Sequence, residues 1–216
     1  MGRPNIIYRH PLLYKAMLYG VHGKHLRERY QQIAEQLQGC TSVFEPCAGP
    51  GLLAKYLPSE MEYSGFDINP RFVSYAQKKG LKVKEGDAHQ EAPFQVECPD
   101  AVVLVDALHH LQPYEAQQRL IQKAAEMALR RIIICEPYGD RYSEILDKFP
   151  SLKGLAARAY NWIERDGSNQ VRFEEMKSKE ELTELANQGF GVIQKIVPRR
   201  IAEIGPEDLL ITYYLR

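Results

Sequence analysis

The sequence predicts an α/β protein built on a mostly parallel sheet, and three observations support this prediction. Segments of strand character alternate with segments of helical character from residue 41 to about residue 136, as βαβ units require. Two of the strand segments, AVVLV and IIIC, are nearly continuous apolar runs, which is typical of parallel strands covered on both faces. A glycine-containing turn follows the first strand segment and leads into the next helical segment.

The strand segments are short, and the two most apolar ones are expected in the middle of the sheet. The expected strands fall at residues 42–45, 62–66, 82–85, 101–106, 131–136, 191–197 and 209–214. The last two are separated by the polar stretch 198–208, which we expect to be a connection.

Capping residues mark the ends of two expected helices. Asn69 and Pro70 supply an N-cap and a first-turn proline, and Gly80 stands where a left-handed residue would close the same helix. Residues 178–181, Ser-Lys-Glu-Glu, form a capping box, and the helix that they begin should end near Gly189.

Two regions lie outside the alternating pattern, although we expect one domain over residues 1–216. Apolar side chains recur at helical spacing in the first forty residues, at Leu26, Tyr30, Ile33 and Leu37, which predicts an N-terminal helical extension over residues 1–40. Residues 138–177 are too apolar for a free loop, so we expect a helical insertion that forms a lid.

The composition narrows the possible partners. Lys plus Arg and Asp plus Glu both total 28, so the formal charge is zero and gives no reason to expect a nucleic acid or an acidic membrane. No apolar run approaches the length of about 20 residues that crosses a bilayer, and the N-terminus lacks the apolar segment of a secretory signal. The four cysteines form no C-x-x-C pair. We therefore expect a cytoplasmic monomer or homodimer without a metal, acting on a small molecule.

The glycine turn and the next strand end predict an adenosine-containing cofactor. Glycine is needed where φ is positive or where the backbone approaches a ligand closely, and the turn carries Gly49 and Gly51. About sixteen residues further on, the second strand ends in Asp67, whose carboxylate can accept hydrogen bonds from both ribose hydroxyls. The pattern Gly49-x-Gly51-x-x-Ala54 also satisfies the dinucleotide fingerprint, so an NAD(P) cofactor is the alternative.

The stretch from Glu45 to Gly51 resembles the first motif of the class I S-adenosylmethionine (SAM)-dependent methyltransferases. That motif is a strand, an acid and G-x-G-x-G, and Cys47 stands in place of the first glycine. Gly86-Asp87-Ala88 follows the third strand, where this family has an acid near the adenine amino group. Residues 106–111, DALHHL, follow the fourth strand and are similar to a motif of the small-molecule members. Gly189-Phe190 leads into the closing strands.

This resemblance implies a Rossmann-like three-layer sandwich, with a seven-stranded, mostly parallel sheet whose last strand is antiparallel, and SAM as the cofactor. The cofactor-binding residues that it implies are Glu45, Cys47, Ala48, Gly49, Gly51, Asp67, Ile68, Asp87, Ala88, Asp106 and Ala107.

The acceptor of the methyl group is expected beyond the carboxyl ends of the central strands. Aromatic residues of the two outlying regions suit a mostly apolar pocket, and we assign to it Tyr14, Tyr19, Tyr138, Tyr160 and Trp162. His109 and His110 are candidates for a general base, because the pKa of histidine lies near neutrality. We favour the other interpretation of this pair, in which the two histidines hydrogen-bond the backbone and shape the cofactor wall.

The predicted function is therefore SAM-dependent methylation of a small molecule, on oxygen or nitrogen. The alternatives are an NAD(P)-dependent oxidoreductase and a SAM-binding protein without catalysis. An enzyme acting on nucleic-acid bases is not expected. The only Pro-Cys pair, Pro46-Cys47, lies in the glycine turn, and an Asp/Asn-Pro-Pro-aromatic sequence is absent after the fourth strand.

Overall fold

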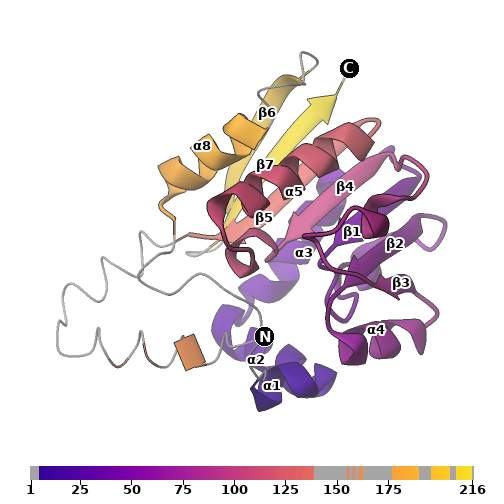
Figure 1. The fold of residues 1–216 in the computed structure, drawn as a ribbon, viewed down its shortest axis with the longest axis vertical. Helices are drawn as coiled ribbons and strands as arrows, with labels where there is room; N and C mark the ends of the chain where they lie inside the picture. The colour runs from indigo at the N-terminus through magenta and orange to yellow at the C-terminus, as the bar shows by residue number, and fades with distance from the viewer. Residues whose placement is uncertain are drawn as a thin grey trace.

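A twisted sheet forms the centre of the fold, and helices cover both of its faces (Figure 1). The computed structural model describes residues 5–138, 155, 158, 161–162, 177–189, 196–204 and 208–215. Most of the expected insertion at 138–177 therefore lies outside the described residues. Within the described residues, no helix has the length and apolar character needed to cross a membrane.

The described strands form one sheet in the order β3-β2-β1-β4-β5-β7-β6. Their bounds are β1 (Ser42–Pro46), β2 (Glu62–Asp67), β3 (Lys82–Glu85), β4 (Ala101–Val105), β5 (Arg131–Pro137), β6 (Ile196–Ile204) and β7 (Asp208–Leu215). Strands β1 to β5 pair in parallel, and β7 is antiparallel to both of its neighbours. The prediction of a Rossmann-like α/β fold with a mixed sheet is confirmed.

The strand order reverses between β1 and β4. The chain runs outward from β1 through β2 to β3 and then returns to place β4 on the other side of β1. The loops that leave the carboxyl ends of β1 and β4 therefore diverge to opposite faces and open a crevice, the usual place for a ligand in an open α/β sheet.

Two buried layers lie on the two faces of the sheet. The helices and 3-10 turns are α1 (Ile6–Arg9), α2 (Pro11–His22), α3 (His25–Gln36), η1 (Leu53–Tyr56), α4 (Pro70–Gln77), η2 (Ala92–Phe94), η3 (Leu108–His110), α5 (Tyr114–Met127) and α8 (Lys179–Gly189). Helices α5 and α8 pack on one face, and α3 and α4 pack on the other. Side chains alternate between the layers along the central strands, so that Phe44 joins the α5 layer and Val43 joins the α3 layer.

The caps predicted from the sequence are present. The Asn69 side chain accepts a hydrogen bond from the Arg71 N–H at 3.1 Å, and Gly80 has a φ of +79° beyond the end of α4. Ser178 and Glu181 exchange two hydrogen bonds of 3.1 and 2.8 Å at the start of α8. These local patterns set the helix boundaries because each one satisfies backbone groups that a helix end leaves unpaired.

Of the strand expected at 191–197, residues 191–195 lie outside the described residues, and residues 196–197 are in a strand. The structure has β6 at Ile196–Ile204, so most of it falls in the polar stretch that we expected to be a connection. β6 is an edge strand, and its register with β7 shifts between Ile196 and Arg199, next to Pro198. An edge strand accepts a proline and charged residues because one row of its backbone groups faces away from the sheet.

Candidate functional site

A cavity of about 250 Å³ lies at the carboxyl ends of β1, β2 and β4. Its size is close to the lower end of the range for small-molecule sites, about 300 Å³ and upward. The glycine loop after β1 forms one wall, the residues after β2 and β3 form a second, and Asp106 to Leu111 contribute a third. Side chains of α1 and α2 complete the cavity, which agrees with the place of these helices at one end of the sheet (Figure 1).

Three residues of the glycine loop adopt positive φ angles: 57° at Cys47, 55° at Gly49 and 70° at Gly51. The cysteine therefore takes the left-handed backbone that the family motif assigns to a glycine, at some cost in strain. A Cβ atom on Gly49 would meet nothing within 4 Å, whereas one on Gly51 would lie 2.4 Å from Leu81 Cδ1. Gly49 thus faces open space in the cavity, and Gly51 lies beneath the loop, outside the cavity lining.

Asp67 ties the glycine loop to the end of β2. One of its carboxylate oxygens accepts a hydrogen bond from the Gly49 N–H at 2.7 Å, and the other accepts one from the Asn69 N–H at 2.8 Å. Both of these donors are backbone N–H groups, so the carboxylate holds the glycine loop and the start of α4 together. Asp67 also lines the cavity.

The residues after β3 form the neighbouring wall. Asp87 accepts hydrogen bonds from the His89 N–H and from His89 Nδ1, both at 2.9 Å. Partial burial tends to raise the pKa of Asp87, but these bonds outweigh it and hold that pKa below its ordinary value. Asp87 lines the cavity together with Ile68, Ala88 and His89.

Glu45 is a buried carboxyl group at the cavity wall. The Tyr63 hydroxyl donates a hydrogen bond to it, but burial raises its pKa to about 8. Burial disfavours the charged form, so this group is largely protonated at neutral pH until a cation or a donor approaches it.

Asp106 begins the loop after β4 with a φ of +51°, which is unusual for a residue other than glycine. The Arg29 guanidinium donates to both of its carboxylate oxygens, from Nη1 at 2.8 Å and from Nη2. Burial opposes ionisation, but Arg29 outweighs it and lowers the pKa of Asp106 to about 2. Asp106 is therefore a permanent carboxylate that lines the cavity, and it cannot accept a proton near neutral pH.

Glu136 at the end of β5 holds the rest of this loop. One of its oxygens accepts from the Ala107 N–H at 2.6 Å and the Leu108 N–H at 2.8 Å, and the other lies 2.8 Å from His109 Nδ1. Ala107 and His109 are thus turned to Glu136 and do not line the cavity, whereas His110 does. The predicted histidine pair is divided, with one ring fixed to the protein and the other facing the site.

Aromatic side chains from the N-terminal helices cover the Asp67 side of the cavity. Tyr14 lies 4.9 Å from Phe72 and 5.4 Å from Tyr8, measured between ring centroids. The Asn69 side-chain amide donates to the Tyr8 carbonyl at 2.7 Å, which docks α1 on the start of α4. Of the predicted acceptor residues, Tyr14 is the one that the described structure places at the cavity.

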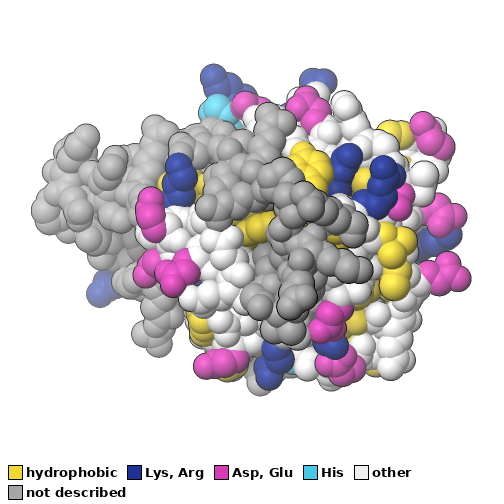
Figure 2. Space-filling model, turned by 90° about the horizontal axis from the view of Figure 1, so that it is seen from above, with side chains coloured by type: hydrophobic (Ala, Val, Ile, Leu, Met, Phe, Trp, Pro, Cys, Tyr) yellow, Lys and Arg dark blue, Asp and Glu magenta, His cyan; other side chains and the backbone are white. Residues whose placement is uncertain are grey.

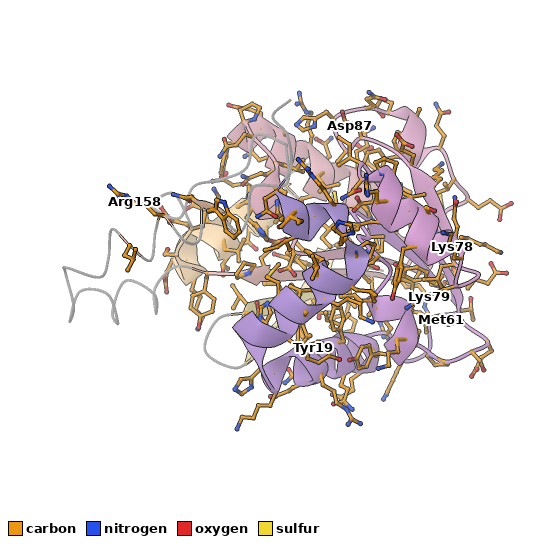
Figure 3. All side chains as sticks on the ribbon, turned by 90° about the horizontal axis from the view of Figure 1, so that it is seen from below. Tyr19, Met61, Lys78, Lys79, Asp87 and Arg158 are labelled. Carbon is orange, nitrogen blue, oxygen red and sulfur yellow. The ribbon has the colours of Figure 1, made fainter. Side chains whose placement is uncertain are left out.

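The other predicted acceptor residues are not brought to this cavity. Tyr19 is half exposed and lines a smaller hollow with Lys15, because five residues along α2 turn its side chain about 140° from Tyr14. Figure 3 shows Tyr19 and Asp87 at opposite sides of the molecule. Tyr138 is buried in the α5 layer.

The insertion contributes two predicted residues, and one of them is described. Trp162 is 53% exposed, and its carbonyl accepts a hydrogen bond from the Asn5 side chain at 2.7 Å. The insertion therefore contacts the start of the N-terminal extension. Tyr160 lies outside the described residues.

Sequence reasoning missed several residues of the site, and Arg29 is the most informative of them. It lies on α3 between Leu26 and Ile33, on the helix face that the apolar spacing assigned to the core. A charged residue at a core-facing position needs a buried partner, so the position of Arg29 on this face could have indicated a buried ion pair. Tyr30, Phe72 and His89, which line the cavity, carry no comparable pattern.

The fold is Rossmann-like, and the cavity lies where the strand order of its sheet reverses. Residues 43–129 match a family model described as "Methyltransferase domain". No curated protein sequence matches the chain. The match, the strand order and the antiparallel β7 agree with the resemblance of the sequence to the class I SAM-dependent methyltransferases.

Solved structures share the fold. The human N-acetylserotonin methyltransferase, in complex with SAM, is 18% identical with a TM-score of 0.64, and the similarity covers 97% of this chain and 57% of that one. A SAM-dependent methyltransferase from Thermotoga maritima, a possible histamine N-methyltransferase, is 18% identical with a TM-score of 0.63, over 98% and 99% of the two chains. This chain thus spans little more than half of the human enzyme and nearly all of the bacterial one.

The magnesium protoporphyrin IX methyltransferase from Synechocystis PCC 6803, with bound S-adenosylhomocysteine (SAH), is also similar to this chain. It is 18% identical with a TM-score of 0.56, over 89% of this chain and 86% of that one. At this level of identity the three similarities show a common fold.

Proposed function

We propose that the cavity binds SAM and that the protein transfers its methyl group to the oxygen or nitrogen of a small-molecule acceptor. The observation that carries this proposal is that the predicted binding elements converge on one cavity. The glycine loop, Asp67, Asp87 and the loop that begins at Asp106 all meet at one cavity at the crevice between β1 and β4. Similar structures contain SAM or SAH, which agrees with this assignment.

The residues present fit an adenosylated cofactor. Asp67, which lines the cavity, would hold the ribose hydroxyls, and Ile68 and Ala88 would flank the adenine beside Asp87. The open space at Gly49 leaves room for a ligand against the backbone. Glu45, with its raised pKa, would ionise when a cationic group of the ligand approaches.

Bound SAM would supply a methyl group that its sulfonium already activates, so the chain itself must orient the acceptor, exclude water and accept a proton where the acceptor has one. We assign proton acceptance to His110, because it lines the cavity. We assign to His109 the task of fixing the loop through Glu136. Tyr8 and Tyr14 exclude water on the Asp67 side.

We further propose one domain over residues 1–216, in which the N-terminal extension covers the cofactor and the insertion covers the acceptor. The contact between Asn5 and Trp162 supports a common cover made from both regions. On the face drawn in Figure 2, acidic and basic side chains are interspersed, as suits a small-molecule enzyme better than a nucleic-acid enzyme.

Labelled methyl transfer tests this function. SAM with a labelled methyl group is incubated with the protein and a panel of amines and hydroxyl compounds, and we expect SAH and a labelled product in equal amounts. Replacement His110→Ala should lower the rate about 100-fold for an acceptor that loses a proton, within the usual range for a general base. SAM binding without transfer to any acceptor would support a non-catalytic protein, and binding of NADH in place of SAM would support an oxidoreductase.

A further inference from the structure

Arg29 is a fully buried cation that joins α3 to the ends of three strands. Besides its two hydrogen bonds to Asp106, it donates from Nε to Cys135 Sγ and from Nη2 to the Cys135 carbonyl, both at 3.3 Å. Its Nε also lies 3.4 Å from a carboxylate oxygen of Asp208, the first residue of β7. The planar guanidinium suits such a site because it offers five donors in a fixed geometry.

The two carboxylates that Arg29 meets differ in position. Asp106 lines the cavity, whereas Asp208 is buried outside the cavity lining. The cavity is therefore lined by the Asp106 carboxylate, and its negative charge is balanced by Arg29, which lies outside the cavity lining. Without Arg29 the same carboxylate would act on a ligand with its full charge, since a buried site screens charge much less than water does.

We propose that Arg29 is a positioning and charge-balancing residue for methyl transfer, acting through Asp106 to set the electrostatic preference of the cavity between SAM and SAH. This inference rests on the proposed function. SAM carries a positive sulfonium and SAH a neutral thioether, so the sulfur loses its charge as the methyl group leaves. An unbalanced carboxylate nearby would stabilise the bound cation more than the transition state, and would raise the barrier.

A purely structural role for Arg29 makes a different prediction. If Arg29 only holds α3 against the sheet, its loss would displace the cavity wall and weaken SAM and SAH alike. The ratio of the two affinities therefore separates the roles, and it needs no knowledge of the acceptor.

The experiment measures SAM and SAH dissociation constants by calorimetry at pH 8.5, because an alkaline pH favours the ionised form of an Asp106 that has lost its guanidinium. Removal of Arg29 alone leaves the buried Asp208 and the part-buried Asp106 without the guanidinium that both of them contact, and endangers folding. The test variant is therefore Arg29→Gln with Asp208→Asn, which removes one charge of each sign. We expect the preference for SAM over SAH to rise at least fivefold. Adding Asp106→Asn to this variant should return the preference to within twofold of the wild type.

Two single variants serve as controls, one expected to leave the preference unchanged and one expected to lower it. Asp208→Asn leaves the Arg29–Asp106 pair intact, so the preference should stay within twofold. Asp106→Asn leaves the cation beside the cavity, so SAM should weaken more than SAH. An unchanged preference in the Arg29→Gln, Asp208→Asn variant would overturn the inference, as would a rise that persists after Asp106→Asn is added. A wild-type protein that binds neither SAM nor SAH would instead contradict the proposed function.

Discussion

At the scale of single residues, Asp67 connects the shape of the glycine loop to the binding of a ligand. Its carboxylate accepts the backbone N–H groups of Gly49 and Asn69, so it fixes the loop that must approach the ligand. A charge-assisted hydrogen bond of this kind is shorter and stronger than a neutral one.

We expect Asp67→Ala to weaken SAH binding by about 1–3 kcal/mol, because hydrogen bonds to a charged acceptor are lost. Asp67→Asn keeps the size of the side chain and one carbonyl acceptor, so it should lose less. Calorimetric titration of both variants measures the difference. Equal affinity in Asp67→Ala and the wild type would show that Asp67 serves only as a cap.

Glu45 predicts an unusual dependence of stability on pH. Its pKa in the folded protein is about 8, above the ordinary value, so the folded state favours the protonated form. The stabilisation is complete below the ordinary pKa of the unfolded chain and is lost as the pH rises through about 8. Glu45→Gln keeps the acceptor for Tyr63 and removes the titration. Between pH 5 and pH 8, the free energy of unfolding of the wild type should fall by a few kcal/mol, about 1.4 per unit of pKa shift, relative to this variant.

Urea denaturation at pH 5, 6.5 and 8 measures this difference. If the wild type and Glu45→Gln keep a constant difference in unfolding free energy over this range, the raised pKa is refuted.

At this scale, the sequence predicted residues that stand in a local pattern. Gly49, Asp67 and Asp87 follow strands and turns, and they line the cavity. Arg29 and Asp106 are 77 residues apart, and their pairing follows from how α3 packs against β4, which no local pattern records. For the same reason the sequence did not distinguish His109, which meets Glu136 across 27 residues, from His110.

At the scale of elements, the two glycines of the glycine loop have different roles: Gly49 faces the cavity, and Gly51 packs against Leu81. Both have positive φ, so alanine strains the backbone at either position. A methyl group on Gly49 would enter the cavity, whereas one on Gly51 would displace Leu81. We expect Gly49→Ala to weaken SAH binding more than tenfold with a loss of stability of about 1 kcal/mol.

Gly51→Ala is the matched comparison. It should lower the melting temperature more than Gly49→Ala does, and it should change the affinity less. Calorimetry and thermal unfolding of the two variants measure both quantities, and the reverse order of effects would refute this division of the loop.

Helix α2 offers a second matched pair. Tyr14 lines the cavity and packs on Phe72, while Tyr19 on the same helix does not reach the cavity. Tyr14→Ala should weaken SAH binding at least fivefold because the cover on the Asp67 side is opened, and Tyr19→Ala should leave it within twofold. Should the two variants bind SAH equally well, α2 does not cover the cofactor.

Elements with a strong local sequence pattern could be predicted, whereas β6 has no such pattern and could not. The central strands are buried on both faces and therefore appear as apolar runs. β6 lies at the edge of the sheet, and its segment IVPRRIAEI combines a proline with three charged residues. The composition of this segment alone therefore predicts a loop. Pairing with β7, a long-range contact, makes this segment a strand.

At the scale of the whole molecule, the strand order places the site. The switch between β1 and β4 opens the crevice, the two parallel strand ends bring Glu45 and Asp106 to it, and the N-terminal helices close it from outside. The alternation of strands and helices was enough to predict the sheet. The cover could not be placed from the sequence, because its position depends on contacts such as Asn69 with Tyr8.

The most direct test of the account is the thermal unfolding of the protein with SAH and with NADH. A ligand that binds only the folded state at a hundred times its dissociation constant stabilises it by about 2.7 kcal/mol. For a domain of this size that corresponds to a rise in melting temperature of roughly 5–10 °C. We predict a rise of this size with SAH and none with NADH. A rise with NADH and none with SAH would contradict the account.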